Sequence, residues 1–418
     1  MANPAHDPDP LARAIRRVTR NENCTGCGGC TLVSPRVTMQ QNPAGFLRPV
    51  ITPATAADTT ATANTKEQTQ AEARQFKAMC PGVAVRAPSP PNALRHPIFG
   101  PYFSAWAASA VDPQVRHAGS SGGVLTALTT WLIDTGQVTS MIGATGDPSA
   151  PSRTVAVTIT TREQALAASG SRYAPVATLA GWAGKPSAGL VAKPCEIAAA
   201  AQHHRASGTT APLPITLSFF CAGTPSQHAT DELVESLGMR QNELSHLRYR
   251  GLGWPGRFTA TSTTGDTASL SYEKSWGTHL GRQLQFSCKL CVDGTGAHAD
   301  IAVGDLWQAD ARGYPVFADS AGNSVAIART TRGHAILLAA AASGVITISP
   351  VSLERVAAIQ PYQVQRRATL LGRLLGRSLA GKPVPHYRGY GLARIALLNP
   401  YGNARALAGT FVRSLRSH

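Results

Sequence analysis

The sequence predicts a mixed α/β (α+β) fold, with a cysteine-rich segment at the N-terminus and a basic helical tail at the C-terminus. Three observations predict it. Residues 1–87 hold four of the eight cysteines in the 418-residue chain. From about residue 100 to 360, helical stretches alternate with short apolar runs, as in domains that pack helices against a sheet. Residues 361–418 contain ten arginines and lysines and no acidic residue.

The first segment opens with three cysteines at the spacing of an iron–sulfur motif. Cys24, Cys27 and Cys30 form a C-x2-C-x2-C run, which bacterial ferredoxins use to bind a 4Fe-4S cluster. Where two-cluster ferredoxins continue with a further Cys-Pro, this chain has Ser34 before the proline. The fourth ligand must therefore come from elsewhere, and Cys80, which also precedes a proline, is the candidate. We predict a ferredoxin-like 4Fe-4S segment here.

Between these cysteines lies a polar stretch rich in threonine and alanine, residues 52–73. It has little to bury, so we expect a linker or mobile loop there. A proline-rich stretch, residues 88–101, then marks the boundary to the α/β body.

The other four cysteines form a second set with none left over: Cys195, Cys221, Cys288 and Cys291. Disulfides are disfavoured, because a chain of this length buries an ample core and no secretory signal directs it to an oxidising compartment. Zinc remains an alternative for the second set, since four thiolates also bind structural zinc. We expect a cytoplasmic protein without a transmembrane segment, because no run of about 18 apolar residues is present.

Within the body, residues 124–134 show the apolar spacing of an amphipathic helix, and residues 188–192, 215–220 and 324–327 are apolar runs typical of strands. Small residues precede that helix: Ser120, Ser121, Gly122 and Gly123. Free N–H groups at a helix N-terminus favour an anion such as a pyrophosphate, although a plain N-cap is the alternative interpretation.

Two further loops combine cationic, aromatic and small residues. Ser171, Arg172 and Tyr173 together offer a hydroxyl, a guanidinium and a ring, which suit a phosphate and a flat ring system. Residues 248–256 again combine arginines, glycines and a tryptophan.

The basic tail carries ten of the sixteen net positive charges of the chain. Such a tail attracts an anionic partner: an acidic redox protein, an anionic cofactor or an anionic membrane surface. We expect no specific nucleic-acid binding, because no recognition motif accompanies the charge. Residues 368–379 have helical spacing, so a helix docked on the body or lying on a membrane is expected. Most of the arginines are expected to form a solvated face.

Eight motifs in a fixed order carry a family resemblance. They are Cys-Thr-Gly-Cys-Gly-Gly-Cys, Ser-Ser-Gly-Gly, Gly-Ser-Arg-Tyr-Ala-Pro, Lys-Pro-Cys, Phe-Cys-Ala-Gly-Thr-Pro-Ser, Tyr-Arg-Gly-x-Gly-Trp-Pro-Gly, Cys-Lys-Leu-Cys and Ala-Asp-Ile-Ala-Val-Gly-Asp-Leu-Trp. This order resembles the beta-subunit family of coenzyme F-420 hydrogenases and dehydrogenases, from about residue 20 to 390. The resemblance implies a family N-terminal domain with flavin loops over residues 100–185 and a C-terminal domain with the second cysteine set over residues 186–360.

The resemblance also implies cofactors and the residues that hold them. Two 4Fe-4S clusters would be bound, one by Cys24, Cys27, Cys30 and Cys80 and one by Cys195, Cys221, Cys288 and Cys291. An FAD would lie along Ser120, Ser121, Gly122, Gly123, Ser171, Arg172 and Tyr173. Lys193 would raise the potential of a cluster or hold a flavin phosphate, unless it is a surface lysine. Glu196 stands where relatives often have glutamine, and would lie near the cluster or at the surface.

The function implied by the resemblance is electron transfer between coenzyme F-420, FAD and the clusters, since a flavin couples a two-electron donor to one-electron acceptors. Partners would be coenzyme F-420 or ferredoxin, with a partner protein in a larger complex also possible. Alternatives are a ferredoxin-dependent reductase of another organic substrate, and a non-catalytic electron-transfer or zinc-organised scaffold subunit. Lys193, His117, Asp293 and Asp305 are candidate acid–base groups, but none is assigned as a general acid, and we favour a structural role for Asp305.

Overall fold

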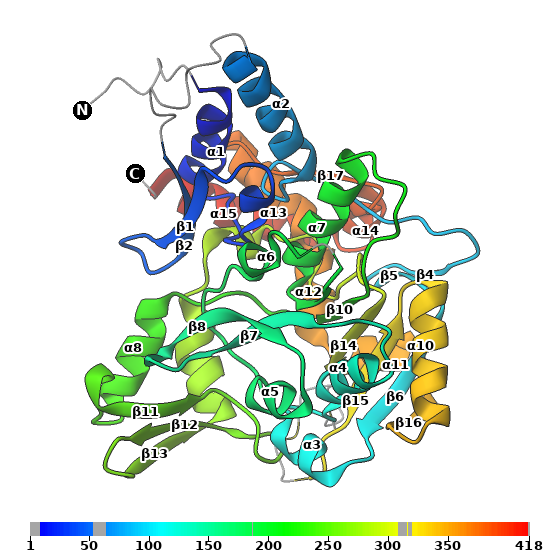
Figure 1. Ribbon diagram of the computed structural model, residues 1–418. Coiled ribbons are helices and arrows are strands. Elements are labelled where there is room, and N and C mark those ends of the chain that lie inside the picture. The colour runs from blue at the N-terminus through cyan, green and yellow to red at the C-terminus, as the bar shows by residue number, and fades with distance from the viewer. Residues whose placement is uncertain (1–8, 53–63, 186, 308–315, 317–319, 417–418) are drawn as a thin grey trace.

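A mixed β-sheet forms the centre of the computed structural model, which describes residues 9–52, 64–185, 187–307, 316 and 320–416 (Figure 1). Within these residues the sheet has eight strands in the order β16-β6-β15-β14-β10-β9-β7-β8. Their bounds are β6 (Ser104–Ala110), β7 (Met141–Asp147), β8 (Ala150–Ile159), β9 (Gly189–Ala192), β10 (Thr216–Phe219), β14 (Ile301–Asp305), β15 (Ser324–Ala328) and β16 (Ile346–Pro350). Strands β7, β9, β10 and β14 are mutually parallel. The mixed α/β fold and the strands at all three apolar runs are confirmed.

Helices cover both faces of the sheet. Met141 and Ile142 are neighbours on β7 but belong to different apolar clusters, because successive strand side chains point to opposite faces. The first cluster contains the predicted helix, α4 (Val124–Asp134), and α10 (Thr331–Ala342); the second contains α6 (Thr178–Trp182) and α7 (Pro194–Ala206). Shorter helices α3 (Pro113–Ala118) and α5 (Arg162–Ala167) flank α4. Both predicted body domains contribute strands to this single sheet.

The N-terminal segment packs on α7 through a helix that the sequence analysis did not predict. It contains α1 (Pro10–Arg20), the hairpin β1 (Val37–Gln41) and β2 (Leu47–Ile51), α2 (Asn64–Met79) and β3 (Ala84–Arg86). The expected linker over residues 52–73 is therefore wrong from residue 64 onward, and residues 53–63 lie outside the described part of the chain. Alanine, glutamate, glutamine and lysine favour helix there, and α2 buries Ala73, Phe76 and Met79.

A smaller antiparallel sheet lies beside the body. It consists of β11 (Leu244–Arg248), β12 (Arg257–Ser262) and β13 (Thr267–Ser271), and it packs with α8 (Gln227–Ser236) around Tyr249 and Phe258. Two further short elements are the hairpin β4 (Leu94–His96) and β5 (Gly100–Tyr102), and helix α9 (Phe286–Lys289).

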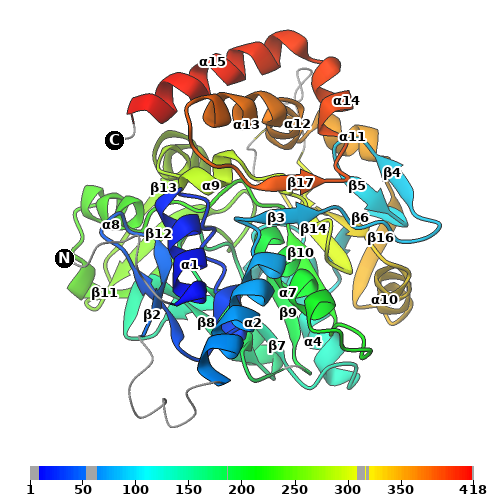
Figure 2. The same cartoon turned by 90° about the horizontal axis from the view of Figure 1, so that it is seen from above.

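The tail forms a helical layer over the N-terminal segment (Figure 2). Helix α11 (Leu353–Ala358) leads into it, and the tail contains α12 (Pro361–Ala368), α13 (Leu370–Leu379), β17 (His386–Arg388), α14 (Leu392–Leu397) and α15 (Pro400–Arg416). Helix α13 docks through Leu370 and Leu374, as expected, and β17 pairs in parallel with β3. No helix among the described residues has the length and apolar character to cross a membrane.

Three of the tail arginines lie outside the solvated face that is expected for most of them. Arg366, Arg367 and Arg377 are buried. Each is used inside the fold: Arg377, for example, donates to the Asn21 carbonyl at 2.6 Å and stacks on the ring of Phe286. The tail therefore helps to join the N-terminal segment to the second cysteine set.

Candidate functional site

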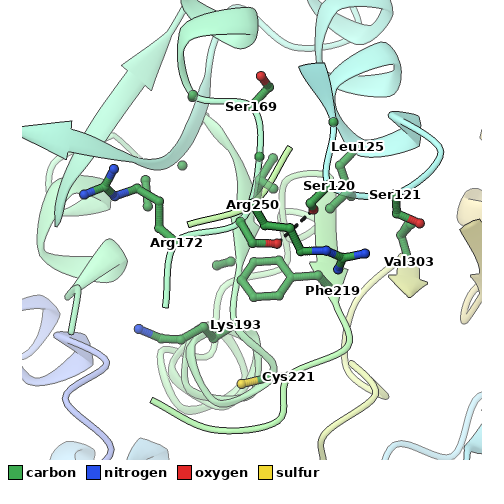
Figure 3. A pocket seen from close by; sticks show the side chains of 18 of the residues that line it. Ser120, Ser121, Leu125, Ser169, Arg172, Lys193, Phe219, Cys221, Arg250 and Val303 are labelled. Carbon is green, nitrogen blue, oxygen red and sulfur yellow. Dashed lines mark hydrogen bonds between the residues drawn. The ribbon is translucent and has the colours of Figure 1, made fainter. Parts of the chain in front are cut away.

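The central cavity, of about 240 Å³, lies where the parallel strands end (Figure 3). Its wall includes residues at the carboxyl ends of β9, β10 and β14, among them Lys193, Phe219 and Asp305. Ligands of open α/β sheets bind at this edge. Seven of the eight predicted cofactor-binding residues line it: Ser120, Ser121, Gly123, Ser171, Arg172, Tyr173 and Lys193.

The two flavin loops predicted from the sequence contact each other across this cavity. Ser171 Oγ donates to Ser120 Oγ at 2.8 Å, the bond drawn in Figure 3. Gly123 takes a left-handed φ of 72° at the start of α4. The remaining predicted residue, Gly122, does not line the cavity, but a Cβ there would meet the Ala108 carbonyl at 2.6 Å. Small residues therefore let this loop seat the N-terminus of α4 against the cavity.

Arg172 has a different role from a phosphate ligand. Its guanidinium points away from the cavity (Figure 3) and donates to Thr154 Oγ1 at 2.8 Å and to three backbone carbonyls, those of Pro151, Arg153 and Leu247. Burial lowers its pKa. The side chain holds the hairpin of β7 and β8 to β11, so only its base contributes to the cavity wall.

Arg250 is a cavity residue that the sequence analysis did not single out. Its guanidinium forms two 2.8 Å bonds with the carboxylate of Asp305 and lies 4.8 Å from the ring centres of both Tyr272 and Trp307. Burial alone would lower its pKa, but Asp305 raises it. The pair fixes the wall of the cavity, which agrees with the structural role favoured for Asp305.

Lys193 and Glu196 form a buried ion pair between the cavity and the second cysteine set. Lys193 Nζ lies 3.0 Å from Glu196 Oε1 and donates to the Val176 carbonyl at 2.7 Å. The carboxylate also accepts from the backbone N–H groups of Thr178 and Lys193 at 3.1 and 2.9 Å. Burial alone would lower the pKa of Lys193, but Glu196 and the neighbouring thiols raise it. The surface alternatives for both residues are therefore wrong.

The first cysteine set surrounds one small cavity in the N-terminal segment. Cys24, Cys27, Cys30 and Cys80 line it with apolar side chains from α1 and α2. Burial raises the pKa of all four thiols, that of Cys27 to about 11, and nearby thiols of the set raise the pKa of Cys30 and Cys80 further. Four thiols in a water-poor cavity form a donor set that fits an iron–sulfur cluster.

The second set gathers beneath α12. Burial, reinforced by Cys288, raises the pKa of Cys221 to about 12, and burial raises that of Cys291 to about 11. The Thr224 N–H donates to Cys288 Sγ at 3.3 Å, as backbone donors to cluster sulfurs do. Cys195, in the first turn of α7, has its pKa raised well above the usual value by burial, with contributions from Cys27 and Cys291. Among the described residues, no group of three or more His, Cys, Asp or Glu side chains is arranged so that it could hold a metal ion.

Contacts connect the two cysteine sets and the central cavity. Cys221 lines the central cavity, and Cys27 lies close enough to Cys195 to raise the pKa of its thiol. Gln285 Nε2 donates to the Thr25 carbonyl at 3.0 Å and lies 3.5 Å from Cys288 Sγ. The cavity, the second set and the first set thus follow one another through the protein.

The other acid–base candidates lie outside the central cavity. His117 is exposed at the end of α3, and Asp293 is buried, with its oxygens accepting from the backbone N–H groups of Thr295 and Ala297 at 2.9 and 2.8 Å. The geometry therefore gives neither residue contact with a substrate in that cavity.

Two family models match this sequence, and both describe the beta subunit of coenzyme F420 hydrogenase/dehydrogenase. Residues 105–181 match the model of its N-terminal part, and residues 187–354 match the model of its C-terminal part. A search of curated proteins found no significant match. Among solved structures, a chain of the F420-reducing [NiFe] hydrogenase complex from Methanosarcina barkeri is similar, with 23% identity and a TM-score of 0.49, over 66% of this chain and 96% of that chain.

Proposed function

The chain belongs to the coenzyme F420 hydrogenase/dehydrogenase beta-subunit family, a family of oxidoreductases, and we propose that it passes electrons between coenzyme F-420, FAD and two 4Fe-4S clusters. One observation carries the proposal: the cavity lined by both flavin loops is also lined by Cys221 of the second cysteine set. A flavin site and a cluster site would therefore share a wall.

Residues of the central cavity suit the flavin. Ser120, Ser121 and the N-terminus of α4 offer hydroxyl and N–H donors for a pyrophosphate, and Tyr173 and Trp276 offer aromatic rings, 4.7 Å apart, beside a flat ring system. When bound, the flavin supplies the exchange between two-electron and one-electron chemistry. The protein's part is to orient it and to exclude water, and the Arg250–Asp305 pair fixes the wall that does so.

Residues of the two cysteine sets suit the clusters. The apolar surroundings of the first set exclude water, and Lys193, Arg366 and backbone donors place positive charge or dipoles around the second. Positive charge near a cluster favours its reduced form and raises its potential. Because these charges are buried, salt screens their effect only weakly.

The chain's charge suits an anionic electron carrier. Coenzyme F-420 carries a phosphodiester and a glutamate tail, so the net charge of +16 would attract it at long range. Arg388, Arg394, Arg405, Arg413 and Arg416 are exposed on the tail and contribute to that field.

The test is oxidation of reduced coenzyme F-420 by the anaerobically purified protein, followed by absorbance with and without ferredoxin. The proposal predicts oxidation with an artificial electron acceptor, and faster oxidation with a suitable ferredoxin. Turnover with ferredoxin but no reaction with coenzyme F-420 would support the alternative reductase of another organic substrate. No electron transfer to any acceptor by flavin-loaded protein would refute the proposal.

A further inference from the structure

A second cavity, of about 450 Å³, also reaches the second cysteine set. We call it the arginine cavity. Its wall includes Cys291, whereas the central cavity reaches the set through Cys221, and the two cavities share no lining residue. Its volume lies within the range of about 300–1,000 Å³ that small-molecule sites occupy.

The charged residues of the arginine cavity are mostly cationic. Arg95, Arg366, Arg367 and Arg394 line it, and Asp293 is the one carboxylate among its described lining residues. Both oxygens of Asp293 already accept backbone N–H groups. The wall therefore has an excess of donors and positive charge over acceptors.

Arg366 is held in a fixed position at the inner end of this wall. It is 4% exposed, and its Nη2 donates to Gln363 Oε1 at 2.7 Å. A Cβ on Gly294 would overlap the same nitrogen, so only glycine leaves room for this guanidinium. Among the described residues, Arg366 has no other hydrogen-bond acceptor, and its remaining N–H groups keep access to the cavity.

Arg367 supports the same wall. It is 8% exposed and donates to the carbonyls of Val292 at 2.5 Å and Tyr390 at 2.9 Å, while its buried Nε has no partner in the described part of the chain. A buried N–H group without a partner costs free energy, and an acceptor on a ligand would recover it.

Much of the rest of the wall is apolar, and the cavity leads to the surface. Pro97, Ile98, Ile395 and Leu398 are among its apolar lining residues. Leu398 is 79% exposed, and Arg394 beside it is also exposed, so both mark the mouth of the cavity. A ligand that fits has an anionic group at one end and an apolar body.

We propose that the arginine cavity binds a small organic anion, whose phosphate or carboxylate group accepts hydrogen bonds from Arg366 and is attracted by Arg394. Guanidinium groups recognise both kinds of anion through paired N–H donors. The site is separate from the proposed flavin site, and binding there requires no electron transfer. It therefore goes beyond the proposed function and stands or fails independently of it.

The test is calorimetric titration of the full-length protein, purified anaerobically with its cofactors, using phenyl phosphate, benzoate, inorganic phosphate and benzyl alcohol as probes. We expect at least one of the two aromatic anions to bind more tightly than inorganic phosphate, and the neutral alcohol not to bind. Absence of binding by both aromatic anions up to about 10 mM would overturn the proposal.

Single substitutions test whether the anion binds in the arginine cavity. Arg366→Gln removes the inner charge, and Arg394→Gln removes the exposed charge at the mouth, where folding is not at risk. Arg366→Gln is expected to weaken binding about tenfold or more, since a hydrogen bond to a charged group is lost. Arg394→Gln is expected to weaken it less, by up to about fivefold, since only the attraction of an exposed charge is lost. Arg405→Gln, an exposed arginine on α15 that does not line the cavity, is the matched control. Equal affinity for Arg394→Gln, Arg366→Gln and the control would overturn the assignment.

A further variant tests the apolar part of the site. Leu398→Ser is expected to weaken binding of the aromatic anion while leaving the affinity for inorganic phosphate unchanged, because it removes only apolar contact. A change of the same size for both probes would contradict the proposed orientation.

Discussion

Replacing Lys193 by methionine removes the positive half of a buried ion pair. Its Nζ lies 3.0 Å from Glu196 Oε1, and the two side chains are 8% and 0% exposed. At an effective dielectric constant of about 20, charges at this separation attract by about 5 kcal/mol. Two backbone N–H groups would still bind the carboxylate of Glu196, so we expect Lys193→Met to lower the free energy of unfolding by about 3 kcal/mol, the lower end for breaking a buried pair.

A double-mutant cycle with Glu196→Gln measures the pair. Lys193→Met should lower the thermal midpoint by about 3 °C, and Glu196→Gln should lower it comparably, because it leaves the ammonium with only the Val176 carbonyl. The double variant has no buried charge and should return to within about 1 kcal/mol of the parent protein. The assay is calorimetry of the anaerobically purified proteins at one scan rate. If the two losses simply add in the double variant, the ion-pair reasoning is refuted.

Three further predictions concern the cavity wall, the flavin loop and the thiols. Gly122→Ala should lower flavin content and stability, since the added Cβ would lie 2.6 Å from the Ala108 carbonyl oxygen. The control Gly277→Ala should change neither, because no atom lies within 4 Å of a Cβ there. The assay measures the flavin released from each protein. Arg250→Lys should lower the thermal midpoint by several degrees, because lysine cannot reproduce the two bonds and the stacking. In metal-free protein, burial raises the pKa of the Cys27 and Cys291 thiols to about 11. Their contribution to the free energy of unfolding is therefore present below about pH 9 and is lost as the pH rises towards about 11. The urea concentration at the unfolding midpoint should fall across that pH window.

Each of these predictions can fail in a defined way. Equal flavin content in both glycine variants would show that close packing of the loop does not shape the cavity. An unchanged thermal midpoint in Arg250→Lys would show that the Arg250–Asp305 ion pair does not stabilise the cavity wall. A flat urea midpoint between about pH 9 and about pH 11 would show that the thiols are not buried as the structure places them.

Local signals in the sequence predicted the elements that depend on local chemistry. The helix at residues 124–134 has its apolar spacing and a glycine at its start, and the strands β9, β10 and β15 are short apolar runs between polar turns. The serine and glycine loop could be placed beside a ligand for the same reason, because a helix N-terminus offers free N–H groups wherever it lies.

Features that depend on tertiary contacts could not be predicted in this way. Arg172 lies in a loop that suits a phosphate, but its guanidinium is taken by carbonyls on β8 and β11, which only the fold brings near. The partner of Arg250 lies 55 residues away. Arg366 and Arg367 look like members of a solvated basic tail, and only the docking of α12 over the second cysteine set buries them.

The central claim, that two cysteine sets and one cavity hold two clusters and a flavin, is tested most directly by the composition of the purified protein. The protein is purified anaerobically and its absorbance spectrum is recorded. Iron, zinc and released flavin are then assayed per chain. We expect about eight irons and about one flavin per chain, with no stoichiometric zinc. One zinc in place of about four irons would contradict the second cluster, and a colourless, flavin-free protein after reconstitution would contradict the account as a whole.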